Sequence, residues 1–563
     1  MSNHPRHRDN PRGPTPNSSE TIKETLESLV MAFVLAFAFR AYVVEAFVIP
    51  TGSMAPTLLG QHLRVQCLQC GYRIQVDVPE HSVKNRTAYG LSYAEDVVCP
   101  MCHYPNYLKA GTQPRSGDRI LVHKYIYNMD TPRRWDVVVF KNPKNPLDNF
   151  IKRLVGLPDE LLLIVEGNVY VKPRGSDASN WQIARKTDEE TNPHAFQIQR
   201  AVWQPIYHSQ YVPLDGGRAE AGRRAGFEWV QPWQWQPLEG GWRIHGRRYQ
   251  HDSADSGSIA FDFRRQTASI FNRYSYNQFR SGSLRRAGIV TSSRNTPGEV
   301  IQPVEDVRIA AAFKPDRDGL SLSIRTTARL DQQVLDARPI ELVASIDGEG
   351  NATLKAPIME AGSKRTDPIL ARKTIDPIRR GRSTQVELWY VDQEASLWVD
   401  GRRILLWQFE IDMDILKRRL PLNPRSYPEI SIIVSGSPVT LHRLEVDRDI
   451  SYTSINPNGS HHQGTFVKMG PDQGGDPIDI LPSQFFCLGD NSPLSHDGRF
   501  WRYPHPHLDK LNLLPTNKAH RYGVVPEQLM IGRAFFVYFP APYPVGGKGP
   551  AVIPNFADMR FIH

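Results

Sequence analysis

The sequence predicts a mainly β protein with one N-terminal transmembrane helix, a β-core, a small four-cysteine module and a large inserted β-sandwich. Short runs of alternating apolar and polar residues, separated by Gly, Asp and Asn, recur along most of the chain. The one long apolar run lies near the N-terminus, and two C-x-x-C pairs follow it. With 563 residues, of which 40% are hydrophobic, the chain can fill several separate cores.

The N-terminal region predicts a membrane anchor after a polar tail. Residues 28–39 carry no charge, Arg40 interrupts the run, and residues 41–44 continue it. As a helix, residues 28–44 would extend about 26 Å, close to the thickness of a bilayer core. A run this short also fits a signal peptide or a buried helix, but no small-x-small cleavage site follows it cleanly. We predict a transmembrane helix over residues 26–45, preceded by a basic cytoplasmic tail with Arg6, Arg8, Arg12 and Lys23.

A serine in a rigid turn comes directly after this run. Residues 47–57 read F-V-I-P-T-G-S-M-A-P-T, and Pro50, Gly52 and Pro56 restrict the backbone around Ser53. A serine hydroxyl becomes a nucleophile only when a neighbouring base can take its proton. Most turns of this composition are only turns, so Ser53 needs a base elsewhere in the chain.

Lys152 is the candidate base. It lies in the segment 150–153 (F-I-K-R), a predicted strand in which apolar neighbours would remove it from water. Loss of hydration disfavours the ammonium and lowers the pKa of a lysine, whereas the guanidinium of Arg153 stays protonated. Taken alone, a solvated strand lysine is the commoner case. His123 and His496 fit hydrogen-bonded histidines at strand ends better than they fit a base.

Further segments, in order, turn this pair into a specific pattern. They read G-D-R-I-L-V-H-K (117–124), R-W-D-V-V-V-F (134–140), N-F-I-K-R-L-V-G-L-P (149–158) and F-F-C-L-G-D-N-S-P-L-S-H-D-G-R (485–499). With residues 47–57 they resemble the conserved boxes of bacterial type I signal peptidases, and residues 522–536 resemble that family's final strand. The resemblance covers residues 22–171 and 478–540, with one insertion inside the first block and a larger one between the blocks.

The resemblance implies a membrane-bound serine endopeptidase with a Ser-Lys dyad and no catalytic cofactor. It matches the nucleophile to Ser53 and the base to Lys152. The matching supporting residues are Ser495, which orients the lysine, Thr51 in the oxyanion hole, the ion pair of Asp497 with Arg499, and the turn of Asp490 and Asn491. The matching pocket residues, which would admit only small substrate side chains, are Phe47, Ile49 and Ile151. Gly498 and the segment 492–494 depart from the common form of the last box.

The resemblance also implies partners and a location. The substrates would be signal peptides of secretory preproteins, bound as an extended strand, and the other partner would be the lipid bilayer. The protein would cross the cell (inner) membrane once, with its N-terminus in the cytoplasm and its catalytic domain on the extracytoplasmic face. The net charge of +9 suits anionic lipid or nucleic acid, but Arg is spread along the chain, so we expect no nucleic-acid partner.

Two C-x-x-C pairs predict a small zinc-ribbon-like module over residues 62–112. Cys67 and Cys70 form the first pair, and Cys99 and Cys102 form the second. Four thiolates make a closed tetrahedral site for a structural zinc ion. Two disulfides are the alternative, because an exported domain permits them. The fifth cysteine, Cys487, lies in an apolar run and is expected to be a buried hydrophobe.

Residues 175–475 predict an inserted β-sandwich. The clearest part is a meander over 385–391, 395–399 and 402–406 with a D-G turn, and further strands are expected at 320–325, 341–346, 429–434 and 439–446. The V-D-G-R-x-I-L hairpin (399–405) resembles laminin-G or concanavalin-like domains. Tryptophans between Trp229 and Trp242 more often pack in a core than form a sugar platform. We expect this insertion to fold on its own beside the site and to supply no catalytic groups.

The expected organisation has six parts. They are a disordered cytoplasmic tail (1–25), the transmembrane helix (26–45), the first part of the catalytic β-core (46–174), the inserted sandwich (175–475), the second part of the core (476–545) and a C-terminal tail (546–563). Two other functions compete with peptide hydrolysis of this kind. One is an exported carbohydrate- or protein-binding protein built on a degenerate protease core. The other is a self-cleaving repressor of the same clan, which the absence of a helix-turn-helix disfavours.

Overall fold

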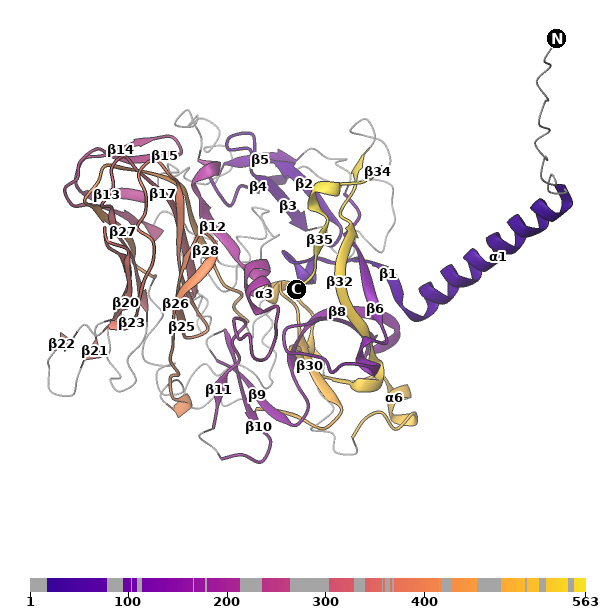
Figure 1. Cartoon of the computed structure of the whole chain (residues 1–563). Coiled ribbons are helices and arrows are strands. Elements are labelled where there is room, and N and C mark those ends of the chain that lie inside the picture. The colour runs from indigo at the N-terminus through magenta and orange to yellow at the C-terminus, as the bar shows by residue number, and fades with distance from the viewer. Residues whose placement is uncertain are drawn as a thin grey trace, which may run out of the picture.

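The computed structural model shows a mainly β protein with a β-core, a four-cysteine module and a sandwich (Figure 1). It describes residues 18–77, 95–102, 104–108, 114–165, 167–177, 180–212, 235–263, 303–328, 340–356, 358–359, 365–366, 369–414, 416, 427–452, 477–501, 504–515, 523–544 and 551–563. The predicted fold class is confirmed in this coarse form.

The core sheet joins the two blocks of sequence that carry the motifs. Its strands, in spatial order, are β1 (Val44–Val48), β6 (Arg119–Lys124), β32 (Met530–Phe539), β7 (Val137–Asn142), β8 (Asn145–Gly156), β30 (Gln484–Leu488) and β31 (Val524–Pro526). The pairing of β30 with β8 places residues that are more than 300 positions apart in the sequence on neighbouring strands. Buried side chains of β6, β7 and β32 pack with Met54 and Leu58 in one apolar cluster.

The C-terminal residues belong to this sheet as well. Strand β35 (Arg560–Phe561) pairs with β32, and Ile562 packs in the same apolar cluster as Met54. The region 546–563, predicted as a tail after the core, therefore ends inside the core. No pattern of alternating residues marks so short a strand.

A small sheet lies beside the core sheet. Its strands, in spatial order, are β11 (Gln182–Ile183), β10 (Asn168–Pro173), β9 (Glu160–Val165) and β29 (Ile478–Ile480). The predicted hairpin at Gly167 is confirmed: Gly167 adopts a φ of 89°, and β9 pairs antiparallel with β10. The two ends of the predicted insertion thus lie in one sheet.

The four-cysteine module consists of two strand pairs. One contains β2 (His62–Gln66) and β3 (Arg73–Asp77), and the other contains β4 (Glu95–Val98) and β5 (Pro105–Leu108). Each C-x-x-C sequence forms the turn between the strands of one pair. Leu63, Ile74, Val76 and Val97 pack around the cysteines in a small core.

In the part of the insertion that the structure describes, the strands form two sheets that pack on each other. One sheet contains β14 (Trp242–His245), β15 (Arg248–His251), β28 (Val439–Arg448), β17 (Val307–Pro315), β24 (Thr384–Val391), β25 (Glu394–Val399) and β26 (Arg402–Gln408), with β12 (Gln204–His208) paired to β28. The other contains β13 (Trp235–Glu239), β16 (Gly257–Phe261), β27 (Ile430–Ser435), β18 (Ser321–Ala328), β19 (Ile340–Ile346), β20 (Asn351–Lys355) and β23 (Ile369–Thr374). One large apolar cluster fills the space between the sheets.

The tryptophans of the insertion pack rather than form a platform where the structure describes them. Trp235 is fully buried and Trp242 is 8% exposed, and both lie in the sandwich core. Trp229 and Trp233 lie outside the described residues.

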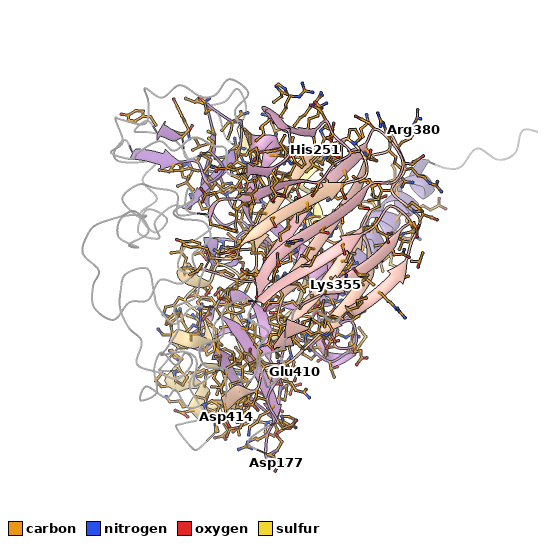
Figure 2. All side chains as sticks on the ribbon, turned by 90° about the vertical axis from the view of Figure 1, so that its left-hand side faces the viewer. Asp177, His251, Lys355, Arg380, Glu410 and Asp414 are labelled. Atoms are coloured by element: carbon orange, nitrogen blue, oxygen red, sulfur yellow. The ribbon has the colours of Figure 1, made fainter. Side chains whose placement is uncertain are left out.

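Two further apolar clusters join the sandwich region to the small sheet. In one, Ile198 and Val202 of helix α3 (Ala195–Val202) and Ile450 pack against Trp135 and Leu162. In the other, Ile411 and Met413 pack against Leu163 and Tyr170. Figure 2 views the molecule from the sandwich side, with Glu410 and Asp414 at the lower end near Asp177 of the small-sheet region. The insertion is therefore fixed to the core region over buried contacts at both ends.

Helix α1 (Ser18–Tyr42) projects away from the folded body (Figure 1). Across the described residues, no helix is both long enough and apolar enough to cross a lipid bilayer. The helix covers the predicted span, but Lys23, Glu24 and Glu27 occupy its early turns. The predicted transmembrane helix over residues 26–45 is therefore not confirmed. The tail over residues 1–17 lies outside the described residues.

Candidate active site

Ser53 lies in a short 3-10 turn that follows β1. The turn spans Gly52–Met54, and the side chain of Met54 is fully buried in the apolar cluster below it, so the adjacent Ser53 remains near the surface. Asn491 fixes this turn from the second block of sequence. Its backbone N–H donates to the Ser53 carbonyl (3.0 Å), and its Nδ2 donates to the Gly52 carbonyl (2.9 Å).

Lys152 points at Ser53 from β8. The Nζ atom of Lys152 donates to Ser53 Oγ over 2.7 Å. The Lys152 side chain is buried, and burial lowers the pKa of Lys152 to about 8, although the carboxylate of Asp497 acts in the opposite direction. The hydrogen bond to the Ser53 hydroxyl thus comes from a lysine that can exist as a neutral amine near neutral pH.

A buried ion pair lies beneath the Ser53 turn. Arg153 donates from Nε and Nη2 to the two carboxylate oxygens of Asp490, each over 2.7 Å, and both side chains are inaccessible to solvent. Thr57 Oγ1 donates to the same carboxylate over 2.5 Å. The remaining Arg153 nitrogen, Nη1, donates to the carbonyls of Trp135 (2.7 Å) and His563 (3.0 Å). The strand that carries Lys152 is therefore tied to the turn that carries Ser53.

A second buried ion pair lies beside Lys152. Arg499 donates from Nε and Nη2 to the two oxygens of Asp497 over 2.8 and 2.7 Å. Burial alone would raise the pKa of Asp497, but Arg499 holds it below its usual range. The backbone N–H of Gly489 donates to Asp497 over 2.9 Å. A Cβ on Gly489 would lie 2.5 Å from the Ser53 carbonyl oxygen, so only glycine fits here.

Two predicted supporting hydroxyls are near the site without forming the expected contacts. Ser495 is buried, its Oγ lies against Gly489, and its hydroxyl helps to lower the pKa of Asp497 rather than contacting Lys152. Thr51 is exposed and makes no capping hydrogen bond to the turn that follows it. Both hydroxyls would have to rotate to act on Lys152 or on a bound substrate.

The predicted pocket residues lie together next to the Ser53 turn. Ile49 is 2% exposed, and the partly buried Phe47 and Ile151 pack against the same cluster as Met54. Phe47 comes from β1 and Ile151 from β8. These side chains form an apolar surface between the strand before Ser53 and the strand with Lys152.

The four predicted metal ligands converge at one point. The Sγ atoms of Cys67 and Cys102, and those of Cys70 and Cys99, are each 3.6 Å apart, and all four side chains are buried. Sulfurs around a tetrahedral zinc with Zn–S of about 2.3 Å are about 3.8 Å apart, whereas a disulfide requires about 2 Å. The Tyr72 N–H donates to Cys70 Sγ over 3.5 Å, as thiolate knuckles require. The donor set therefore fits a zinc ion, and both of these sulfur–sulfur distances exceed the length of a disulfide bond.

Two other clusters of possible ligands in the described residues already contain a cation. Arg308 pairs with Glu445 and Asp447 beside His208, and Lys186 lies between Asp392 and Asp449. The ammonium of Lys186 is 2.7 Å from Asp392 and 2.8 Å from Asp449. Both clusters are buried ion networks of the sandwich and its junction rather than additional metal sites.

Sequence reasoning missed three contributions to the site. Arg153 is unsuitable as a base, and the sequence gives no sign that its guanidinium binds Asp490 below the Ser53 turn. Thr57 carried no signal, because its partner Asp490 is 433 residues away in sequence. Arg560, from the last strand, donates from Nη2 to the Thr57 carbonyl (2.7 Å) and pairs with Asp118 (3.0 Å).

Comparisons of the sequence identify proteins that are similar to part of this chain. Residues 111–215 match the family described as "Signal peptidase, peptidase S26", a range that includes Lys152. Signal peptidase I of Buchnera aphidicola subsp. Schizaphis graminum is 30% identical over 136 residues, 24% of this chain and 29% of that protein. Signal peptidase I of Rickettsia bellii is 25% identical over 155 residues, 28% of this chain and 41% of that protein. The resemblance to the type I signal peptidases is confirmed, and the chain spans less than half the length of these two relatives.

Several solved structures are similar to part of the chain. A carbohydrate-binding module, CBM66 from Bacillus subtilis, is 9% identical and covers 38% of this chain and 95% of its own, with a TM-score of 0.21. The lumenal domain of VIP36 in a Ca2+-bound form is 12% identical and covers 42% of this chain and 88% of its own, with a TM-score of 0.24. Likenesses at these TM-scores establish neither fold nor function for this chain.

Proposed function

We propose that this protein is a serine endopeptidase that removes signal peptides from exported preproteins, with Ser53 as nucleophile and Lys152 as general base. The observation that carries the proposal is the 2.7 Å contact between Lys152 Nζ and Ser53 Oγ, made by a buried lysine whose pKa is lowered to about 8. The confirmed relation to the signal peptidases supports the same reaction class.

The chemistry follows from this pair. The neutral amine of Lys152 takes the proton of the Ser53 hydroxyl while Oγ attacks the substrate carbonyl carbon. The tetrahedral intermediate collapses, the C–N bond breaks, and the Lys152 ammonium protonates the departing amine. Water then attacks the ester on Ser53, again with Lys152 as base, and releases the acid. We assign stabilisation of the oxyanion to the backbone N–H of Ser53 and the hydroxyl of Thr51.

The remaining predicted residues hold this geometry. The pairs Arg153–Asp490 and Arg499–Asp497, together with Asn491, support the turn and the strand that meet at the site. The apolar surface of Phe47, Ile49 and Ile151 would accept small side chains of a substrate bound as an extended strand. We assign Ser495 the task of orienting Lys152 once its hydroxyl rotates.

We also propose that α1 attaches the protein to a lipid bilayer, with the basic tail on the cytoplasmic side. The support is a set of apolar α1 side chains that are each more than half exposed: Ile22, Leu26, Leu29, Val30, Met31, Phe33, Val34, Leu35 and Phe37. Burial of such side chains in lipid is favourable. Sedimentation of the full chain with membranes, lost when residues 1–42 are removed, tests this point.

The four cysteines would hold a structural zinc ion. Cys67, Cys70, Cys99 and Cys102 would be its ligands, and a site with four protein ligands leaves no position for a reacting water. The zinc would stabilise the module rather than take part in hydrolysis.

Cleavage of a purified preprotein, detected by mass spectrometry at a single site, tests the proposed reaction. Ser53→Ala and Lys152→Ala should each abolish cleavage, and the double variant should lose no more than either alone, because the pair acts as a unit. Lys152→Arg should be as inactive as Lys152→Ala. Substantial activity in Lys152→Ala would remove Lys152 from the role of base. Stable binding of a polypeptide or sugar without cleavage would favour the binding-protein alternative.

A further inference from the structure

The chain leaves the sandwich through a short buried segment that reaches the active-site supports. This exit segment, Asp449–Tyr452, follows β28, and all four residues are at most 6% exposed. The N–H of Tyr452 donates to the Gly167 carbonyl over 3.1 Å. The hydroxyl of Ser451 lies against Gly167, where a Cβ would come within 2.1 Å of it. The exit segment is thus fixed to the turn between β9 and β10.

One end of the exit segment is held by the sandwich junction. The carboxylate of Asp449 accepts from Gln199 Nε2 (2.9 Å) and lies 2.8 Å from Lys186 Nζ. Lys186 also pairs with Asp392 at the turn between β24 and β25, over 2.7 Å. Buried ion pairs tolerate little displacement, because separation leaves an uncompensated buried charge.

The other end of the exit segment touches the active-site supports. The ring of Tyr452 lies under Arg499, with the guanidinium carbon 5.9 Å from the ring centroid, within the range of a cation–π contact. The charged groups that face the Tyr452 hydroxyl are Asp490, Arg153, Lys186 and Asp449. The hydroxyl itself has no hydrogen-bond partner among the described residues, so the contact with Arg499 is made by the ring.

Arg499 matters to the Ser53–Lys152 pair through Asp497. Among the charged neighbours of Lys152, Asp497 has the largest effect and raises the pKa of Lys152 against the effect of burial. Cys487 and Asp490 act in the same direction, while Arg499 lowers this pKa. If Arg499 moved away from Asp497, the carboxylate would act on Lys152 without this compensation. Lys152 would then hold its proton more tightly and act as a base only at higher pH.

We propose that Tyr452, which the insertion supplies, is a positioning residue for the Ser53–Lys152 pair. Arg499 also lies 5.1 Å from the Phe500 ring and donates to Ser492 Oγ (2.8 Å) and to the Ser492 carbonyl (2.9 Å). The Tyr452 ring adds the contact from the insertion that helps to keep Arg499 against Asp497, while Asp449 and Lys186 fix the exit segment to the sandwich. The inserted sandwich therefore influences the charges around Lys152 through Tyr452 and Arg499, without touching the substrate. The inference deepens the proposed function and rests on it only for the readout of peptide cleavage.

The test compares Tyr452→Phe and Tyr452→Leu with a control, Phe313→Leu, which changes an equally buried ring in the sandwich core. Two readouts are used: kcat and KM for an internally quenched signal-peptide substrate between pH 6 and pH 10, and competitive labelling of Lys152 with acetic anhydride over the same range. Tyr452→Phe keeps the ring and should stay within about twofold of the wild type in both. Tyr452→Leu should lower kcat at pH 7 by about tenfold with little change in KM, and should raise the labelling midpoint of Lys152 by about one pH unit.

Three results would overturn the inference. They are a Tyr452→Leu protein with wild-type kcat and labelling curve, the same changes in Phe313→Leu, and a loss in Tyr452→Phe as large as in Tyr452→Leu. If the wild type cleaves no peptide, the proposed function fails, but the labelling curves still decide the role of Tyr452. If Tyr452→Leu does not fold, Tyr452→Met, which fills a similar volume without an aromatic face, takes its place in both readouts.

Discussion

Lys152 combines two properties that rarely occur together in a lysine. It is enclosed by protein, and among the described residues its Nζ donates to the hydroxyl of Ser53 rather than to a carboxylate. The neighbouring carboxylates of Asp490 and Asp497 are instead bound by Arg153 and Arg499. The two arginines thus keep the carboxylates from pairing with Lys152, and this leaves burial as the dominant influence on its pKa.

The pH dependence of cleavage should report this pKa. Because only the neutral amine accepts the Ser53 proton, kcat/KM should rise with pH along a limb with an apparent pKa of about 8. Below that pH, kcat/KM should fall by about tenfold per unit. Steady-state kinetics from pH 6 to pH 10 on a neutral peptide provide the measurement. A flat profile up to pH 9, or a limb near the ordinary lysine value, would contradict the assignment.

The buried pair of Arg153 and Asp490 should be among the most sensitive single positions in the chain. Arg153→Leu leaves the Asp490 carboxylate buried without its partner, which should cost about 3–5 kcal/mol of stability. The double variant Arg153→Leu/Asp490→Leu should recover much of this loss, because no charge is left unpaired. Urea unfolding is the measurement. Arg382→Leu, at the exposed pair with Asp400, is the control and should change stability by about 0–1 kcal/mol. Equal losses in both single variants would show that burial does not govern the effect.

Single residues were predictable where chemistry made them unusual. A lysine within an apolar strand and a serine between prolines stand out in the sequence, and the structure brings the two together. Thr57 and Arg560 do not stand out, because their importance comes only from partners distant in sequence. The rotamers of Ser495 and Thr51 depend on packing, which a sequence pattern does not specify.

At the scale of elements, local patterns predicted strands well and connections poorly. The meander over β24, β25 and β26 lies where alternation and the D-G turn at residues 400–401 indicated it. Helix α3 was not predicted. Its Phe196 stacks on Trp398 with ring centroids 4.7 Å apart, so its position depends on a partner strand about 200 residues away. Strand β35 contains two residues and is defined by its pairing to β32 rather than by its own composition.

The four-cysteine module should depend on metal. Purified protein should contain about one zinc per chain, because four converging thiols fit a closed tetrahedral site. Cys67→Ser or Cys102→Ser should lose the zinc and expose the β2–β5 segment to proteolysis, while the core sheet stays folded. Elemental analysis and limited proteolysis give the readouts, and Cys487→Ser, in the core sheet, is the matched control that should keep its zinc. Protein without metal and with two disulfides by mass spectrometry would be the contrary result.

The boundary between the β-core and the inserted sandwich is less sharp in the structure than the sequence predicts. The sandwich strands share one core, which supports the expectation that the sandwich folds on its own. The flanking segments behave differently. Ala184, Ile198, Ile450 and Tyr452 lie within the predicted insertion, yet they pack in a cluster with Trp135 of the core region. Residues 184–202 and 450–452 are therefore poor places to separate the two parts, and a boundary drawn from composition could not reveal this.

Two deletions should distinguish the sandwich from its flanks. Gln204 and Arg448 are paired residues of β12 and β28, so a short Gly/Ser linker can replace residues 204–448 with little loss of chain entropy. This variant retains Ile198, Val202, Ile450 and Tyr452 but loses Ile411 and Met413, which pack against Leu163 and Tyr170. It should fold with a lowered Tm. Replacing residues 180–470 removes both sets of contacts, and this variant should not fold at all.

Thermal unfolding followed by circular dichroism gives the Tm of each variant. Peptide cleavage by each folded variant gives its activity. We expect the Tm to be highest for the full chain and lower for the 204–448 deletion, with no cooperative transition for the 180–470 deletion. The isolated segment 204–448 serves as the control and should unfold cooperatively, because its two sheets enclose their own core. If the 180–470 deletion folds and cleaves peptide as fast as the full chain, the flanking segments do not belong to the catalytic unit, and the sandwich with its exit segment has no part in setting the active site.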